Sequence, residues 1–198
     1  TVIALSIERF FALRTAFGKS SLTKFVIEVK KAINGGDMAK AQQICDKQQG
    51  CVANVVGASI AAYKEMETLP NLKRAQKVAK IQQAHEEATQ LEMPTLQMNM
   101  PIIATIVTLG TLTALFGTVV GMIRSFAALA AGGGADSQAL SLGISEALVN
   151  TASGILTSWV AVVAYNYYTN KIDKLTFALD EVGYSIAQTY EANHTEEA

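Results

Sequence analysis

The chain has 198 residues, of which half are hydrophobic and only 17% are charged, and its formal net charge is −1. Soluble domains carry about 25% charged residues, so this chain is poor in charge and has ample apolar surface, which excludes disorder along its whole length. The absence of a basic excess argues against nucleic-acid binding, and two cysteines exclude a disulfide scaffold.

Residues 1–13 begin with an apolar run, TVIALSI, that ends at Glu8. Seven helical residues cover about 10 Å, which is too short to cross a bilayer. A basic region before the apolar run and a small-residue cleavage site after it would be needed for a signal peptide, and neither is present. We therefore expect residues 1–13 to be the end of a first transmembrane helix that starts before Thr1.

Residues 14–92 are polar and follow a helical pattern. Asp37 and either Ser20 or Ser21 stand where N-caps are expected, and Gly and Pro residues separate the apolar-periodic segments. The pattern predicts four helices, over residues 22–33, 38–48, about 52–67 and 72–91. The last of these is rich in charge and is expected to face solvent or a partner.

Two later stretches contain no charged residue, residues 93–123 and residues 147–170. A transmembrane helix needs about 20 mostly apolar residues, and both stretches are long enough. The prediction is a second transmembrane helix at 93–127, a hairpin at 128–137 that holds three consecutive glycines, and a third transmembrane helix at 138–170. The alternative is a pair of buried helices in a soluble bundle.

Residues 171–198 form a charged C-terminal tail that continues the third span. Its apolar side chains predict a partly packed helix with a frayed end. The side chains on which this prediction rests are Phe177, Val182, Tyr184 and Ile186.

The distribution of positive charge sets the expected orientation. Thirteen of the 16 lysines and arginines lie between Arg9 and Lys80, and none lies in the segment 126–145. Basic loops stay on the cytoplasmic side, so residues 14–92 and 171–198 are expected in the cytoplasm and the N-terminus and the hairpin outside. The expected fold is an all-α polytopic membrane protein, with three transmembrane helices and long helices that extend into a cytoplasmic helical domain.

Polar residues inside the two complete spans are the candidate functional residues. Glu146, Asn150, Ser153 and Thr157 are spaced i, i+4, i+7 and i+11, so they form one stripe, and Thr151 and Ser158 lie beside it. Glu146 belongs either to an ion pathway or to an interfacial or structural hydrogen-bond network.

The second span adds several threonines, of which Thr105, Thr108, Thr111 and Thr118 share a face. They either hold helices together or line a polar lumen. Gly117 and Gly121 form a GxxxG pair that permits close helix approach. Arg124 is expected to extend toward the hairpin side, where Asp136 is a candidate partner.

The sequence contains no signature of an enzyme or of a metal or cofactor site. It lacks a glycine-rich phosphate loop, an HExxH motif and a GxSxG motif. His85 and His194 lie on polar segments without an evident partner, and they are far in sequence from Cys45 and Cys51, which the orientation places in a reducing compartment. We therefore expect no metal, no cofactor and no catalytic residue.

Longer motifs in both spans resemble the MotA/TolQ/ExbB proton-channel family. The run LTALFGTVVGMIRSF at 112–126 is similar to the family's second span, and the run at 142–166 is similar to its third, with the G-I-x-E-A-L-x-x-T-A-x-G core at 143–154. The IER at 7–9 is similar to the end of the first span. The GTVxG and GIxEAL motifs resemble ExbB, the biopolymer transport protein of the TonB system, and TolQ more than the flagellar stator.

The resemblance implies a bacterial inner-membrane protein with a periplasmic N-terminus and hairpin. It implies a homopentameric ring around a single-span ExbD/TolR-type partner, whose membrane aspartate carries the proton. It further implies that proton flow turns the ring and drives a TonB/TolA-type periplasm-spanning protein. Carried over by motif, Thr118, Glu146 and Thr151 are the channel residues.

Four positions depart from the family pattern. Gly110-Thr111 and Val160 stand where the family often has proline, so both helices are expected to be straighter. Asn150 adds a polar group to the lumen face, and Arg124 replaces an uncharged polar residue. The complete set of candidate channel residues is Thr118, Glu146, Thr151, Asn150 and Thr111, and the helix-packing residues are Gly117, Gly121 and Gly154.

Three functions remain open at this point. The first is an ExbB-like motor subunit that energises outer-membrane transport, and the second is a TolQ-like motor that maintains the envelope. The third is a membrane scaffold that conducts no ion, in which the polar residues only hold helices together.

Overall fold

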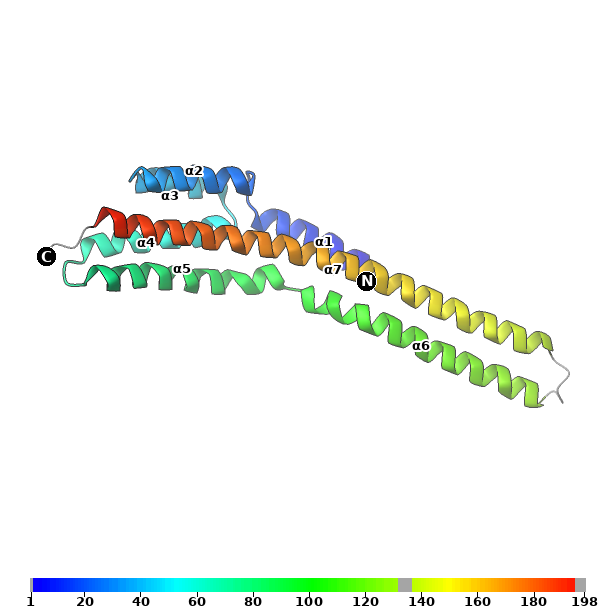
Figure 1. The fold of residues 1–198 in the computed structure, drawn as a ribbon. Coiled ribbons are helices and arrows are strands. Elements are labelled where there is room, and N and C mark those ends of the chain that lie inside the picture. The colour runs from blue at the N-terminus through cyan, green and yellow to red at the C-terminus, as the bar shows by residue number, and fades with distance from the viewer. Residues whose placement is uncertain (1, 132–136, 195–198) are drawn as a thin grey trace. The chain divides into compact units, whose positions relative to one another are not determined.

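The computed structural model describes residues 2–131 and 137–194, and all the regular secondary structure in these residues is α-helical. The predicted all-α class is therefore confirmed for the described part of the chain. The helices are α1 (Val2–Ala16), α2 (Leu22–Asn34), α3 (Met38–Gln48), α4 (Cys51–Thr68), α5 (Arg74–Gln97), α6 (Met100–Ala131) and α7 (Ser137–Asn193), as Figure 1 shows.

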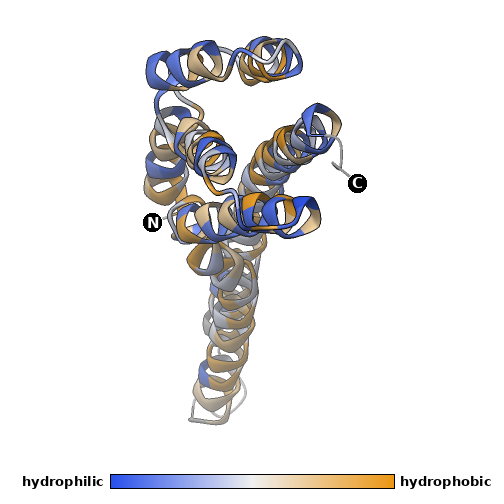
Figure 2. Ribbon diagram, turned by 90° about the vertical axis from the view of Figure 1, so that its left-hand side faces the viewer, coloured by the Kyte–Doolittle hydropathy of each residue, from blue (hydrophilic) through white to orange (hydrophobic). Residues whose placement is uncertain are grey.

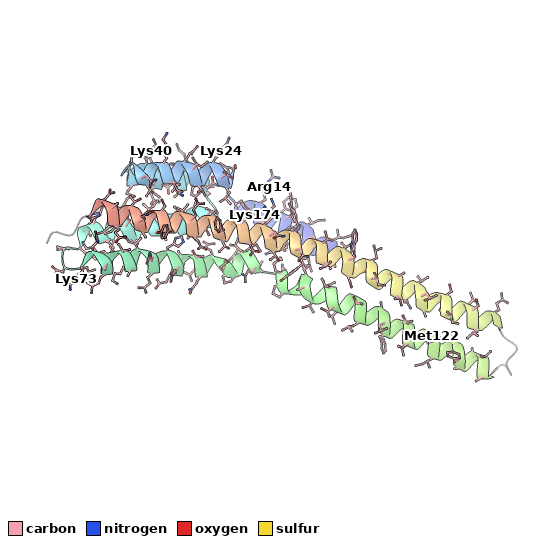
Figure 3. All side chains as sticks on the ribbon, viewed as in Figure 1. Arg14, Lys24, Lys40, Lys73, Met122 and Lys174 are labelled. Atoms are coloured by element: carbon pink, nitrogen blue, oxygen red, sulfur yellow. The ribbon has the colours of Figure 1, made fainter. Side chains whose placement is uncertain are left out.

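The chain divides into two compact units. Unit 1 comprises residues 1–7 and 99–169, and unit 2 comprises residues 8–98 and 170–198. Unit 1 therefore holds α6 and the first part of α7, whereas unit 2 holds α2 to α5 and the rest of α7. All five basic side chains that Figure 3 labels belong to unit 2, whereas the labelled Met122 belongs to α6.

Unit 2 is a helical bundle with an ordinary apolar core. Helix α2 contributes one face, in which Phe25, Val26, Val29 and Ile33 are buried at helical spacing. Consecutive helices from α2 to α5 pack against one another. The first three predicted helices are close to the observed ones, since α2, α3 and α4 begin and end within one residue of them, whereas α5 begins two residues later and ends six residues later than the predicted 72–91.

One of the two predicted helix N-caps makes the expected side-chain hydrogen bond. Asp37 caps α3, because its carboxylate accepts a hydrogen bond of 2.9 Å from the backbone N–H of Lys40. Ser21 stands at the N-cap of α2 but makes no side-chain capping bond. The hydroxyl of Ser20 instead donates to the side chain of Gln48, whose amide donates to the carbonyl of Phe17 at 2.7 Å, so this cluster joins the loop before α2 to the end of α3.

The end of α7 packs into unit 2 with a different face from the predicted one. Phe177 and Tyr184 are 71% and 66% exposed, so the expectation that they pack inside this chain is wrong, whereas Val182 and Ile186 are fully buried. The large side chains that α7 buries in unit 2 are spaced by three or four positions and are Ile172, Leu175, Leu179, Val182, Ile186 and Tyr190. Sequence alone does not show which of two apolar stripes a long helix buries.

Helix α5 runs through Pro94 and ends at Gln97, where Asn99 adopts a positive φ of 63°. Arg9 of α1 is fully buried against this end, and its guanidinium donates to the carbonyls of Thr95 and Leu96 at 3.5 Å. These carbonyls belong to the last turn of a helix, which leaves them without intrahelical donors, so a cation there is favourable.

Unit 1 is built around the antiparallel pair of α6 and the first part of α7, which lie side by side in Figure 1. Residues 132–136 between them lie outside the described residues, so half of the expected hairpin at 128–137 and the expected partner Asp136 are not described. The hydroxyl of Tyr168 donates to the carbonyl of Ser6 at 2.6 Å, which ties the start of α1 to α7 within this unit.

Two helical stretches among the described residues are long and apolar enough to cross a membrane. Their most apolar windows lie within Arg74–Ala130 and Leu140–Asn193, with mean hydropathies of 2.0 and 1.6. Only 6% and 11% of these windows are buried inside the chain, in contrast to the core helices of a soluble bundle. Hydrophilic colouring in Figure 2 is correspondingly frequent on the helices of unit 2 and sparse on α6.

Candidate functional site

Small residues bring α6 and α7 into close contact along their whole shared length. A Cβ atom added to Gly121 would lie 2.8 Å from the Cβ of Ala147, and one added to Gly110 would lie 2.7 Å from the Oγ of Ser158. Gly154 faces Ala114 even more closely. These contacts place small side chains of both helices opposite each other, which is how membrane helices pack tightly without large apolar side chains.

Two hydroxyl pairs bridge this helix interface. Thr118 and Thr151 are hydrogen-bonded to each other, and Thr111 lies 2.9 Å from Ser158 between their oxygen atoms. Thr118 also reaches the carbonyls of Ala114 at 2.9 Å and of Ala147 at 3.4 Å. A hydroxyl has one proton, so the proton of Thr118 has several acceptors within reach, in both helices.

Several other hydroxyls of the pair bond to their own helices. Thr105 donates to the carbonyl of Pro101 at 2.8 Å, Thr157 to that of Ser153 at 2.9 Å and Ser125 to that of Gly121 at 2.9 Å. Such local bonds satisfy a hydroxyl at membrane depth without a ligand. They leave the oxygen lone pairs available to accept a further hydrogen bond.

Beside the hydroxyl pairs, a polar groove follows one side of the α6/α7 pair. It consists of two cavities of about 540 and 200 Å³, which both include Phe116, Gly117 and Asn150 in their walls. The larger cavity adds Thr113 of α6 and Ser153 and Thr157 of α7, and the smaller one adds Arg124 and Glu146. The stripe that the i, i+4, i+7, i+11 spacing predicts on α7 therefore lies along this polar groove.

The five candidate channel residues separate into two groups. Glu146 and Asn150 are exposed and line the polar groove, whereas Thr118 and Thr151 are half-buried and bond to each other across the interface. Thr111 belongs with the second group through Ser158. The three predicted packing glycines, Gly117, Gly121 and Gly154, all face α7 or α6 across the interface.

Sequence reasoning did not select several residues that take part in the site. Ser153 and Thr157 were visible in the stripe, but the family motif did not include them as channel residues. Thr113 of α6 shares no face with the other threonines of that span and still lines the larger cavity. Gly110 and Gly143 face Ser158 and Ser125 closely, although neither belongs to a GxxxG pair.

The titratable groups of unit 2 are structural rather than reactive. Burial raises the pKa of the Cys45 and Cys51 thiols to about 12, with smaller contributions from Asp46 and Glu92, so both thiols stay protonated and inert. Among the described residues, no group of three or more His, Cys, Asp or Glu side chains is arranged to hold a metal ion.

The two histidines have partners that the sequence did not reveal. His194 stacks on the ring of Tyr190 at 4.2 Å between centroids. The Nδ1 atom of His85 lies 2.9 Å from the Oγ of Ser59, whose proton goes to the carbonyl of Val55 at 2.9 Å. His85 therefore donates from Nδ1, and its Nε2 atom, which faces Gly183, is buried without a hydrogen-bond partner in the described structure.

Comparison with known proteins gives one family match. The model of the MotA/TolQ/ExbB proton channel family matches residues 54–181, which is more than half of the chain. The matched range includes both halves of the polar groove and the helix pair that forms it.

Individual relatives agree with the family match. The biopolymer transport protein ExbB-like 3 of Synechocystis sp. is 36% identical over 43% of this chain and 41% of its own length. The Tol-Pal system protein TolQ of Haemophilus influenzae is 34% identical over 42% of this chain and 37% of its own. The Tol-Pal system protein TolQ of Pseudomonas aeruginosa is 28% identical over 63% of this chain and 54% of its own length. The chain thus spans about half or less of the length of these relatives.

Proposed function

We propose that this chain, which belongs to the MotA/TolQ/ExbB proton channel family, forms a homopentameric stator ring around a single-span ExbD/TolR-type partner in a bacterial inner membrane. In this proposal, proton flow between ring and partner drives a TonB-type protein that energises outer-membrane transport. Family and relatives support the coarser statement, an ExbB/TolQ-type proton-channel motor subunit.

The observation that carries the proposal is the polar groove on an otherwise apolar helix pair. Large apolar side chains such as Leu115, Val119 and Leu156 are more than half exposed on these helices, as they are on helices in contact with lipid or with another chain. A stripe that includes a carboxyl group is costly in such a setting, at about 2.5–3.5 kcal/mol for an acidic side chain at mid-membrane. Such a stripe is expected to face a protein interior or a water-filled path.

The groove supplies the groups that proton transfer along a helix pair requires. Glu146 provides a carboxyl group, Asn150 an amide, and Thr113, Ser153 and Thr157 provide hydroxyls with free lone pairs. The Thr118–Thr151 pair, by contrast, is placed to hold α6 and α7 at a fixed distance. In this proposal the residues of the groove conduct protons, and the hydroxyl pairs hold the two helices that form the groove together.

The proposed orientation follows the distribution of charge. Residues 14–92 carry 12 of the 16 basic residues and residues 171–198 carry two, which leaves Arg9 and Arg124 outside both segments. Positive loops remain cytoplasmic. Both segments belong to unit 2, so unit 2 is the proposed cytoplasmic part, and residues 1–13, 93–127 and 138–170 are the proposed spans.

The test is proton flux through the complex reconstituted in liposomes with its co-expressed single-span partner. Glu146→Gln and Asn150→Ala are expected to lower the flux by about tenfold or more, because the first replaces an ionisable carboxyl group by an amide and the second removes an amide from the groove. Thr105→Val is the matched control, since Thr105 bonds only to its own helix and lies outside both cavities. Equal flux in all variants would contradict a conducting groove.

A Tol-type envelope motor is the second candidate function. It is favoured by the similarity to TolQ of Pseudomonas aeruginosa, which covers 63% of this chain. Deletion of the gene separates the two systems. Loss of uptake through TonB-dependent outer-membrane transporters is expected for the first, and sensitivity to detergent with normal uptake for the second.

The third candidate, a scaffold without ion flux, predicts that the liposome experiment gives no flux even for the unmodified complex.

A further inference from the structure

Unit 1 contains very few charged residues. Its residues 1–7 and 99–169 include only Arg124, Asp136 and Glu146, and of these Asp136 lies outside the described residues. The described part of the unit thus has one cation, on α6, and one anion, on α7.

These two charges come from different helices and line the same small cavity. Its volume is about 200 Å³, and its walls are largely formed by Gly117, Gly121, Gly143 and Ala147, which carry little or no side chain. Arg124 lies seven residues before the end of α6 and Glu146 nine residues after the start of α7. At 1.5 Å per residue both lie about 10–14 Å from the hairpin end, so they stand at a similar height in the antiparallel pair.

Close packing at this height brings the backbones of the two helices together. The backbones approach so tightly at Gly121 and Ala147 that an added Cβ atom would lie 2.8 Å away, and Gly143 is packed against Ser125. In the described structure neither charge has an ion-pair partner within 4.0 Å, and both side chains are exposed in the cavity. Two unpaired opposite charges that share a cavity attract strongly when the surroundings are apolar.

We propose that Arg124 is the counter-ion of Glu146 and acts as a positioning residue of the groove. When α6 and α7 lie in the membrane, the guanidinium holds the carboxylate in the cavity, next to Asn150, and compensates its charge. The functional part of this proposal rests on the proposed proton pathway, whereas the pairing itself does not. It assigns a role to Arg124 that the family motif does not include.

The alternative is that Arg124 extends past the end of the helix pair to water, as long basic side chains near helix ends can do. In that case Arg124 and Glu146 act independently, and substitutions at the two positions have additive effects. Additivity therefore distinguishes the two arrangements.

The first readout is thermal unfolding of the full protein in mild detergent or lipid for Arg124→Gln, Glu146→Gln and the double variant. Each single substitution leaves one uncompensated charge in the cavity, so each is expected to lower the unfolding midpoint. The double variant is expected to unfold at a higher temperature than either single variant. Arg14→Gln, at an exposed arginine of unit 2, is the matched control and is expected to combine additively with Glu146→Gln.

The second readout is proton flux in the reconstituted complex. Arg124→Lys keeps the charge and is expected to retain flux within about threefold, whereas Arg124→Gln is expected to lose about tenfold or more. Shifts of the unfolding midpoint that add up in the double variant would overturn the pairing. Equal proton flux for Arg124→Lys and Arg124→Gln would also overturn it. If the unmodified complex carries no flux, the proposed function fails, and the unfolding midpoints alone decide whether the pair forms.

Discussion

The two parts of α7 differ in whether their large apolar side chains are exposed or buried, although both parts belong to one continuous helix. In unit 1 its large apolar side chains point outward, and Leu148, Leu156 and Trp159 are 62–63% exposed. In unit 2 the apolar side chains point inward, and Leu175, Leu179 and Val182 are at most 1% exposed. A membrane around unit 1, as the proposed function requires, accounts for the difference, since lipid removes the driving force for burying apolar side chains and water restores it.

The polar groups of the two units differ in the same way. In unit 1, hydroxyls bond to backbone carbonyls or to each other, as with Thr118 and Thr151, which is the arrangement expected at membrane depth, where water does not reach them. In unit 2, Arg9 is buried against the end of α5, whereas the pair of Lys30 and Glu181, at 2.8 Å, lies near the surface and is expected to be weak. Unit 1 is therefore held by small residues and hydroxyls, and unit 2 by an apolar core.

The strongest test of this contrast is the same substitution in both parts of α7. Leu179→Ala removes a buried side chain of unit 2 and is expected to lower the free energy of unfolding by about 2–5 kcal/mol. Leu156→Ala removes an exposed one and is expected to change it by less than about 0.5 kcal/mol in detergent. Unfolding midpoints of the two variants measure the difference, and equal losses would contradict the assignment of the two media.

A second pair of substitutions exploits the glycines. Gly154→Ala forces a Cβ atom against Ala114 and is expected to destabilise the α6/α7 pair by about 1–3 kcal/mol. Gly57→Ala in α4 meets nothing closer than 3.6 Å and is expected to stabilise unit 2 by about 0.5–1 kcal/mol through its helix propensity. The unfolding midpoint is expected to fall for Gly154→Ala and to rise for Gly57→Ala. A lower midpoint for both variants would contradict the difference in packing between the two units.

The third test is the pH dependence of unit 2. Burial lowers the pKa of His85 below its usual 6.5, against smaller opposing effects of Asp180 on α7 and Glu86 on α5. The unfolded chain therefore binds more protons than the folded chain at mildly acidic pH, so stability is complete above about pH 6.5 and falls as the pH decreases, by at most about 1.4 kcal/mol per pH unit.

Unfolding of the protein and of His85→Gln between pH 7.5 and about pH 5 measures this effect. The variant is expected to show a weaker dependence on pH over that range, because glutamine does not titrate. An unchanged dependence would mean that other groups cause it.

The smallest expected effect concerns the hydroxyl bridge. Thr118→Val removes the bond to Thr151 and is expected to cost about 0.6 kcal/mol, the average for interhelical hydrogen bonds in membrane proteins. Adding Thr151→Val is expected to cost little more, because the bridge is already lost. Thr105→Val, which affects only a bond within α6, serves as the control. Fully additive costs for the two substitutions would show that the bridge does not form.

Much of the fold follows from the sequence because local signals were strong. The glycines, Pro70 and Asp37 mark helix ends of unit 2, and the apolar periodicity of α2 identifies its buried face. The charge-free stretches predict the helix pair of unit 1 for the same reason. Which stripe of α7 packs in unit 2 was not predictable, because Phe177 and Tyr184 are large side chains with apolar rings, and the buried stripe also ends in a tyrosine, Tyr190.

The candidate site was predictable in position and not in its internal arrangement. The stripe from Glu146 to Thr157 follows from helical spacing alone. Its separation from the Thr118–Thr151 pair depends on how α6 and α7 are rotated against each other, which close glycine contacts decide. The partner of His85 is equally a tertiary property, since Ser59 lies 26 positions away in the sequence.

The most direct test of the proposed function is the native mass of the protein in lipid or mild detergent, with and without its co-expressed single-span neighbour. In the proposed ring, further copies and the single-span partner cover the polar groove and part of the exposed apolar surface of this helix pair. Five copies that gain the single-span protein are the predicted result. A monomer or dimer whose mass does not change with the neighbour would contradict the stator and leave a scaffold as the better explanation.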